Sequence, residues 1–254
     1  MQPLKARITS YEDICDPRLM PRVPLIINLN GRNFSKITSL LPKPFSLELG
    51  QCLYATMADL VQEIEGAVFA YSFNDEITII VRNDQTLDTQ PWYDNSVSKI
   101  ISAASSLATL HFNDAAAELE VNLSGDPIFL SKIFTVPNLT EAVNVMVYHQ
   151  QRAHQIAVRL ACFYELIKKY RKHEIEEMLM DTSLEEKIKL LKEEAGIDFY
   201  EYPVEFRRGV VCYRRPETIN YNGEDIVKER WALNTDVPIF TSEKEFLQDI
   251  IKKH

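Results

Sequence analysis

The sequence lacks the long apolar runs that membrane proteins need. No run approaches the roughly 18 apolar residues of a transmembrane helix, and the N-terminal segment has no signal-peptide pattern. We therefore expect a cytoplasmic protein without membrane contact. Cysteine is also scarce: the four cysteines show no metal-ligand or disulfide spacing, so reduced structural thiols are expected.

The sequence also has no excess of positive charge. The net charge of −9 argues against a broad nucleic-acid-binding surface, because phosphate contacts need lysine and arginine. Any RNA contact must be local, and basic side chains next to aromatic ones suit it. The candidate residues are Lys168, Lys169, Arg171 and Lys172 at the end of a long helix, and Arg207 and Arg208 beside Phe206. The alternative for basic runs at helix ends is that they only complement the helix dipole.

At 254 residues and 46% hydrophobic, the chain can bury a substantial core as one large or two modest domains. Apolar patterning predicts an α+β fold for residues 1–137. The order is βαββαβ, which closes into an antiparallel sheet with helices on one face. The predicted elements are a strand at 23–29, a helix at 46–64, a hairpin at 66–82, a helix at 95–112, and strands at 118–123 and 128–136.

Residues 138–254 are predicted to form a helical and hairpin extension packed on that domain. A helix is expected over 139–169, and a second runs to Ala195 from Ser183, which has capping-box spacing with Glu186. Residues 199–215 are predicted to be strands. The segment 216–254 is polar and poorly patterned until a last amphipathic turn.

Two polar segments are predicted to form one site. Asn30 and Gly31 end an apolar strand, and Asn74, Asp75 and Glu76 lie at the tip of the predicted hairpin. Carboxylate and carbonyl oxygens at one point suit a hard divalent cation such as Mg²⁺, and such sites serve phosphoryl and nucleotidyl transfer. Each segment also has a plainer interpretation, because Asn-Gly is a common turn dipeptide and acids at hairpin tips are usually solvated.

Several motifs, in their order along residues 1 to about 215, resemble those of the tRNA-histidine guanylyltransferase family, most closely its shorter 3′-to-5′ polymerase branch. They are Arg18-Leu19-Met20-Pro21-Arg22-Val23-Pro24, Asn30-Gly31-Arg32, Lys43-Pro44-Phe45, Phe69-Ala70-Tyr71-Ser72-Phe73-Asn74-Asp75-Glu76, Ser98-Lys99-Ile100-Ile101-Ser102, Phe134-Thr135-Val136-Pro137, and Tyr202-Pro203 before Phe206-Arg207-Arg208-Gly209.

This resemblance implies a palm-like catalytic domain that adds nucleotides, directed by a template, to the 5′ end of tRNA. ATP and GTP would be substrates, two Mg²⁺ ions the cofactors, and a tetramer built as a dimer of dimers the assembly. It implies metal ligands at Asn30, Gly31 and Asp75, with Asp75, Glu76 and Asn30 as the catalytic set. The implied nucleotide contacts are Arg32, Asn33, Phe34, Lys43, Asn74, Ser98 and Lys99, and His154 is an implied tRNA contact.

Some of these roles have alternatives. Lys99 lies at the start of a predicted helix, where free N–H groups favour phosphate, but it could equally be a solvated lysine. His154 could be an ordinary helix histidine. The chain departs from the family at four positions: Asn30, Ser46 and Leu130 replace aspartates, and Asn74 replaces a serine. Ser46 would cap the following helix as well as an aspartate would.

Asn30 is the departure with the largest consequence, since it keeps an oxygen ligand but loses a negative charge. Three explanations stay open: an engineered inactivation, a natural branch with lost or altered catalysis, or a site that tolerates a neutral ligand. The main alternative function is therefore a catalytically silent homologue that binds nucleotide or tRNA. A palm-type nucleotide cyclase or signalling-nucleotide synthase is a further alternative with the same metal chemistry.

Overall fold

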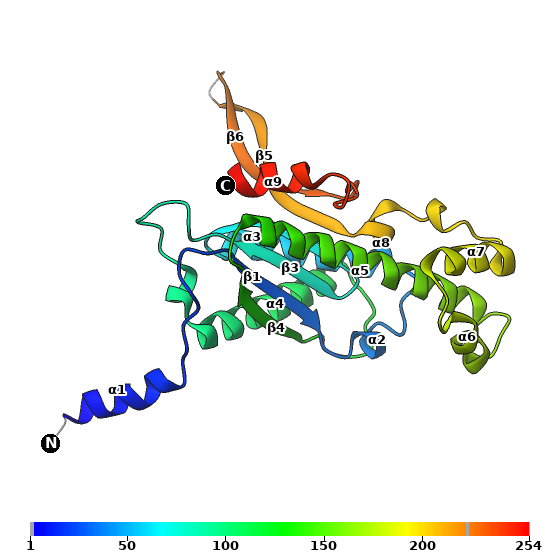
Figure 1. Ribbon diagram of the computed structural model, residues 1–254, viewed down its shortest axis with the longest axis horizontal. Coiled ribbons are helices and arrows are strands. Elements are labelled where there is room, and N and C mark those ends of the chain that lie inside the picture. The colour runs from blue at the N-terminus through cyan, green and yellow to red at the C-terminus, as the bar shows by residue number, and fades with distance from the viewer. Residues whose placement is uncertain (1–2, 222–223, 254) are drawn as a thin grey trace.

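A computed structural model describes residues 3–221 and 224–253 and has a mixed α/β architecture built on one antiparallel sheet (Figure 1). The six strands lie in the order β4-β1-β3-β2-β5-β6. They are β1 Leu25–Gly31, β2 Ala67–Phe73, β3 Glu76–Val81, β4 Phe129–Thr135, β5 Val210–Tyr221 and β6 Glu224–Asn234. The helices are α1 Leu4–Ile14, α2 Phe34–Ile37, α3 Leu47–Glu63, α4 Val97–Glu118, α5 Leu139–Leu166, α6 Lys172–Leu179, α7 Leu184–Ala195, α8 Val204–Arg208 and α9 Lys244–Lys253, with short 3-10 turns at Trp92–Asn95 and Phe199–Glu201.

The first four strands confirm the predicted βαββαβ order. Helices α3 and α4 connect them and pack on one face of the sheet, where the odd-numbered apolar side chains of β1 point. The other face is covered by the long helix α5, which buries Val143, Met146 and Ala157 against Ile26 and Phe69 (Figure 1). Because β-strand side chains alternate between faces, the even-numbered residues Asn28 and Asn30 lie on the α5 side.

Local signals fix several helix ends as predicted. The hydroxyl of Ser46 accepts a hydrogen bond from the Leu49 N–H at 3.2 Å, which confirms the capping role. Ser183 and Glu186 form the predicted capping box, and Gly196 ends α7 in the left-handed conformation. The four cysteines are free, and all but Cys15 are buried.

Two sequence predictions are wrong. No strand forms at 118–123: α4 continues to Glu118 because Ala115 and Ala116 extend its buried stripe, and the alternating segment that follows does not pair with the sheet. The long helix predicted over about 139–169 is confirmed as α5, which ends at Leu166. Residues 199–208 form a 3-10 turn and α8 rather than strands, and β5 begins only after Gly209, whose φ is +81°.

The segment 216–254 is more regular than its sequence indicates. Strand β5 continues to Tyr221 and pairs with β6 in a long ribbon that extends beyond the rest of the sheet (Figure 1). Much of this ribbon is exposed, so no hydrophobic alternation marks it. The predicted last amphipathic turn belongs to α9, which buries Leu247 and Ile251.

The two predicted parts of the chain, residues 1–137 and 138–254, contribute strands to the same sheet. The division between them at residue 137 stays a prediction. Within the ranges described above, no helix is both long and apolar enough to cross a membrane.

Candidate functional site

The end of β1 and the tip of the β2–β3 hairpin lie next to each other and line one pocket. Asn30 lies opposite Glu76 in the β1–β3 pairing, and the Gly31 N–H donates to the Asp75 carbonyl at 2.9 Å. Helix α5 covers this end of the sheet with His149 and Arg152. Together these residues line a pocket of about 200 Å³.

Glu76 is the most heavily bonded acid of the site. His149 Nδ1 lies 2.7 Å from its Oε1 and Arg152 NH1 lies 2.9 Å from its Oε2, and the Asn28 amide also donates to Oε1 at 2.7 Å. Burial alone would raise the pKa of Glu76, but these three partners lower it below its usual value. Glu76 is therefore an ionised anchor between the sheet and α5, with both oxygens already occupied.

Asn30 takes part in the same network through its amide nitrogen. Its Nδ2 donates to Asn28 Oδ1 at 2.5 Å, while Asn28 donates to Glu76 and to Thr78 Oγ1. This arrangement leaves Asn30 Oδ1 as the group that can accept a hydrogen bond or bind a cation. An aspartate at position 30 could not make the bond to Asn28.

Asp75 is the freer of the two carboxylates. Its side-chain partner is the neighbouring Asn74, whose amide donates to Oδ1 at 2.7 Å. Burial, with the Glu76 charge nearby, raises the pKa of Asp75 above its usual value. A cation placed next to Asp75 would therefore stabilise its ionised carboxylate.

The oxygen atoms available here suit one Mg²⁺ ion, provided that a bound substrate supplies further oxygen ligands. Asp75 can supply a carboxylate, Asn30 an amide oxygen and Gly31 its carbonyl, which matches the preference of Mg²⁺ for one or two carboxylates plus substrate phosphates. Among the described residues, no three His, Cys, Asp or Glu side chains gather in a way that could hold a metal. A second ion therefore finds no further free carboxylate here.

Gly31 is required by packing. A Cβ built on it would lie 2.2 Å from the ring of Phe34, and that ring is held edge-on by Phe112 and Phe129. Phe34 is thus a core residue with 3% exposure, so its ring cannot contact a nucleotide, and any contact through its backbone stays a prediction. Arg32 and Asn33 are exposed beside it and remain available to a ligand.

We expect Gly31→Ala to lower the free energy of unfolding by about 1–3 kcal/mol, because the clamped Phe34 ring cannot move aside. Urea denaturation measures this. Gly125→Ala is the matched control, since a Cβ there meets no atom within 4 Å. Equal stability of the two variants would contradict the packing argument.

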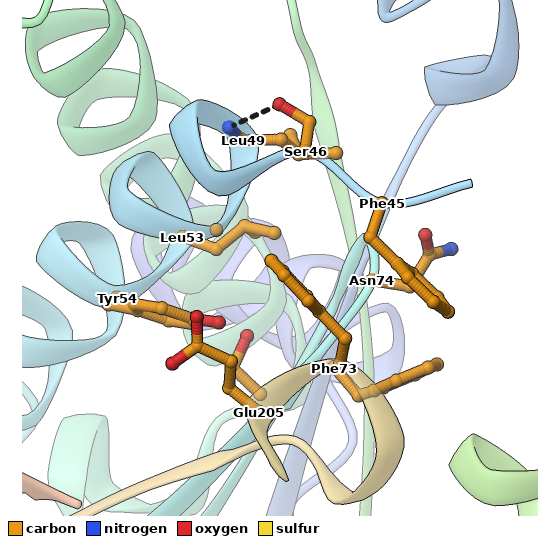
Figure 2. Close-up of a pocket in the computed structure, with 11 residues that line it drawn as sticks. Phe45, Ser46, Leu49, Leu53, Tyr54, Phe73, Asn74 and Glu205 are labelled. Atoms are coloured by element: carbon orange, nitrogen blue, oxygen red, sulfur yellow. Dashed lines mark hydrogen bonds between the residues drawn. The ribbon is translucent and has the colours of Figure 1, made fainter. Parts of the chain in front are cut away.

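A second, ring-lined pocket adjoins the first at Phe73 and Asn74. Figure 2 shows Phe45 and Asn74 together on one side of it, with Tyr54 and Glu205 on the other. Phe45 stacks on Phe206 with centroids 5.1 Å apart. Asn74 therefore borders both pockets, consistent with its predicted place at the nucleotide.

Lys43 lies in the loop before α3, and its side chain reaches helix α5. Its Nζ is 3.4 Å from Thr38 Oγ1 and 5.7 Å from the centre of the Tyr164 ring. Burial lowers the pKa of Lys43. Its nucleotide contact stays a prediction.

Ser98 and Lys99 require a correction. The start of α4 lies near the far end of β3, where Asn83 bonds Asn95, so it is about 15–20 Å along the strand from Glu76. The Asp16 carboxylate already accepts the Ser98 N–H and hydroxyl at 3.2 and 2.7 Å. Within one chain, the structure therefore does not bring Ser98 or Lys99 to the pocket, and an internal carboxylate occupies the predicted phosphate position.

Three of the predicted tRNA contacts do come together. His154 lies near Arg207 and Arg208 and packs edge-on against Phe199 at 5.4 Å. Burial lowers the pKa of His154, and the two arginines lower it further, so its ring is neutral at pH 7. The cluster can offer RNA two positive charges and a neutral hydrogen-bonding ring.

The other basic group lies elsewhere. Lys168 pairs with Glu165, and Lys172 with Glu176 at 3.7 Å, while Lys169 donates to the Glu194 carbonyl. Arg171 is exposed beside them. Helix α5 rises about 18 Å between His154 and its end at Leu166, so the two basic groups are separate, and an RNA contact by the second one stays a prediction.

Sequence reasoning missed Asn28, His149 and Arg152. Asn28 had a usable signal, because it lies two residues before Asn30 and therefore on the same face of β1. His149 and Arg152 share one face of a long helix, but nothing in the helical pattern indicates which end of the sheet that face covers.

Comparison with known proteins gives a consistent family. The family described as "Thg1: tRNAHis guanylyltransferase" matches residues 5–137. "tRNA(His) guanylyltransferase 1" of Arabidopsis thaliana is 24% identical over 88% of this chain, but only 40% of that relative is covered. The Schizosaccharomyces pombe tRNA(His) guanylyltransferase is also 24% identical, over 86% of this chain and 83% of its own length.

The fold is matched by solved structures. A bacterial tRNA(His) guanylyltransferase (Thg1)-like protein in complex with ATP has a TM-score of 0.82 at 24% identity, covering 98% of this chain and 99% of its own. The Saccharomyces cerevisiae tRNA(His) guanylyltransferase has a TM-score of 0.69 at 20% identity, covering 84% of this chain and 91% of its own. At these identities the likeness establishes the fold.

Proposed function

The chain belongs to the Thg1 family of tRNA(His) guanylyltransferases, and we propose that it adds nucleotides to the 5′ end of tRNA in the 3′-to-5′ direction. The observation that carries the proposal is the meeting of Asn30, Gly31 and Asp75 at one pocket, on the strand ends where the family motifs lie. Residues of α5 on either side of His154 in the sequence, Ala153 and Ile156, also line this pocket.

In the proposed reaction, the 3′ hydroxyl of the incoming nucleotide attacks the phosphorus of an activated 5′ end. A new phosphodiester forms, and the bond to the activating AMP or to pyrophosphate breaks. A Mg²⁺ ion bound at this pocket would promote loss of the hydroxyl proton and neutralise phosphate charge. Asp75 would hold that ion with Asn30 and Gly31, while Arg32, Asn33, Lys43 and Asn74 would orient the nucleotide.

The tRNA would approach along α5. His154, Arg207 and Arg208 form the local basic surface that an acidic chain needs for RNA. A lone cluster of this size supports contact with one end of the RNA rather than with its whole length. Binding at the acceptor end is what the proposed reaction requires.

Assembly as a dimer of dimers, a cytoplasmic location and the division into parts 1–137 and 138–254 are proposals of the same kind. Exposed Leu4, Ile8 and Ile14 on α1, a helix that buries none of its side chains, support assembly. Light scattering after size exclusion measures the assembly directly.

The proposal is tested with a tRNA that lacks its first 5′ nucleotide, incubated with ATP, GTP and Mg²⁺. We expect a product one nucleotide longer at its 5′ end, resolved on a sequencing gel and absent without protein. Binding of tRNA and GTP without any extension would instead support the silent homologue, which is favoured by the neutral Asn30 and by the occupied Glu76. Product from nucleotide alone would support a cyclase.

A further inference from the structure

Arg152 is the permanent positive charge that lines the candidate pocket, and no sequence motif marks it. It lines the same pocket as Asn30 and Asp75. Its side chain is 47% exposed, although NH1 is held by Glu76 at 2.9 Å. The guanidinium is thus fixed at one end, while the side chain as a whole stays accessible and borders both this pocket and a neighbouring one.

The remaining donors of Arg152 are free to bind a ligand. A guanidinium has five N–H groups in a planar fork that matches phosphate oxygens. Across the described part of the chain, the bond to Glu76 is the only hydrogen bond or ion pair that this guanidinium makes. His149, on the same helix face, donates to the other oxygen of Glu76.

The charges around the pocket also favour an anion. They do so more strongly than the carboxylate-rich surroundings of a two-metal site would without its ions. Asn30 removes one carboxylate, and the permanent charge of Arg152 offsets that of Glu76. Only Asp75 is left to repel a phosphate that arrives without a metal ion. A second cation would have no carboxylate to hold it, whereas an arginine already stands in the pocket wall.

We propose that Arg152 binds the phosphates of the nucleoside triphosphate directly and supplies the positive charge that a second metal ion would otherwise provide. This proposal rests on the proposed function in one respect, namely that the ligand is a nucleoside triphosphate. Arginine clamps on phosphoryl groups are a general means of stabilising such charge. One consequence is that triphosphate binding to this chain depends only weakly on Mg²⁺.

Calorimetric titration of inorganic tripolyphosphate and of GTP, each in EDTA and in Mg²⁺, tests this without requiring any turnover. In EDTA, Arg152→Gln is expected to weaken the binding of both ligands by about tenfold or more. Arg159→Gln is the matched control, since Arg159 is an exposed arginine on the same helix that lines a different pocket. It should bind as the native chain does.

A double variant separates phosphate contact from a merely structural role. If Arg152 acts only by neutralising Glu76, then adding Glu76→Gln to Arg152→Gln restores binding, because no unpaired carboxylate remains. If Arg152 touches phosphate, the double variant stays as weak as Arg152→Gln, and Glu76→Gln alone binds at least as tightly as the native chain. The double variant also guards against misfolding, since it leaves no buried charge without a partner.

Restored binding in the double variant, native affinity in Arg152→Gln, or no binding of tripolyphosphate by the native chain in EDTA would each overturn the proposal. Its outcome is independent of the tRNA extension assay. Arg152-dependent binding without extension would overturn the proposed function alone, and extension with Mg²⁺-dependent binding would overturn this inference alone.

Discussion

Asp75→Asn is expected to reduce nucleotide addition by a factor of about 10³ or more, with little change in stability. Of the two carboxylates that line the pocket, Asp75 is the one without an ion pair, because Glu76 is paired with Arg152 and hydrogen-bonded to His149. With Asn30 neutral, the variant would leave the cation site without a free anionic ligand. The rate is measured in single-turnover extension of the shortened tRNA at saturating GTP.

The stability of this variant follows from the raised pKa of Asp75. Because its folded-state pKa lies above the unfolded value, ionising it disfavours folding: the advantage of the protonated form is present below the unfolded pKa and is lost as pH rises through the folded pKa. At pH 7 an isosteric amide removes that disadvantage and still accepts from Asn74. The melting temperature should therefore be unchanged or higher, which separates lost chemistry from lost fold.

The control is Asp88→Asn, an exposed carboxylate in the loop after β3. It should keep native activity. If Asp75→Asn extends tRNA within about tenfold of the native rate, the chemistry does not occur at this pocket. The proposed roles of Asn30 and Gly31 would then be wrong as well.

Local patterns predicted the parts of the site that lie on one hairpin or one strand. A tight turn between two apolar runs sets the hairpin, and its tip then carries Asp75 and Glu76 to the end of β1. The capping of α3 by Ser46 needs only three neighbouring residues. These features depend on short stretches of chain, so one sequence suffices to predict them.

The rest depends on contacts between distant segments. His149 and Arg152 reach Glu76 because α5 crosses the far face of the sheet, and helical periodicity does not specify that path. Lys99 was expected to bind phosphate from its local position, but Asp16, distant in the sequence, occupies the helix start. The β5–β6 ribbon was missed because its largely exposed side chains leave no alternation to read.

Asn30→Asp is expected to make the site bind Mg²⁺ more tightly, so that less Mg²⁺ is needed for activity. A second carboxylate beside Asp75 strengthens the attraction for a divalent ion. We expect nucleotide addition at low Mg²⁺ concentration to rise by about tenfold or more, and GTP binding to become tighter in Mg²⁺ than in EDTA. A magnesium titration of the extension rate, native against variant, measures the first effect.

The same substitution should destabilise the metal-free protein. Asn30 Nδ2 donates to Asn28 Oδ1 at 2.5 Å, and a carboxylate in that position would place two acceptor oxygens against each other. Asn28 cannot easily turn its amide around, since it donates to Glu76 and Thr78. We expect a loss of about 1–3 kcal/mol in EDTA, recovered in Mg²⁺ because an ion that binds only the folded state stabilises it. Asn30→Ala, which cannot bind a cation through its side chain, is the control and should show no such recovery.

The result distinguishes the explanations for Asn30. Higher activity of Asn30→Asp, with stability restored by Mg²⁺, means that the pocket retains the geometry of a carboxylate site and that asparagine is what limits it. Unchanged activity together with a loss of stability that Mg²⁺ does not repair means that the Asn28, Asn30 and Glu76 network is built around the amide. In that case the chain has a site adapted to a neutral ligand, and Arg152 becomes the group on which phosphate binding depends.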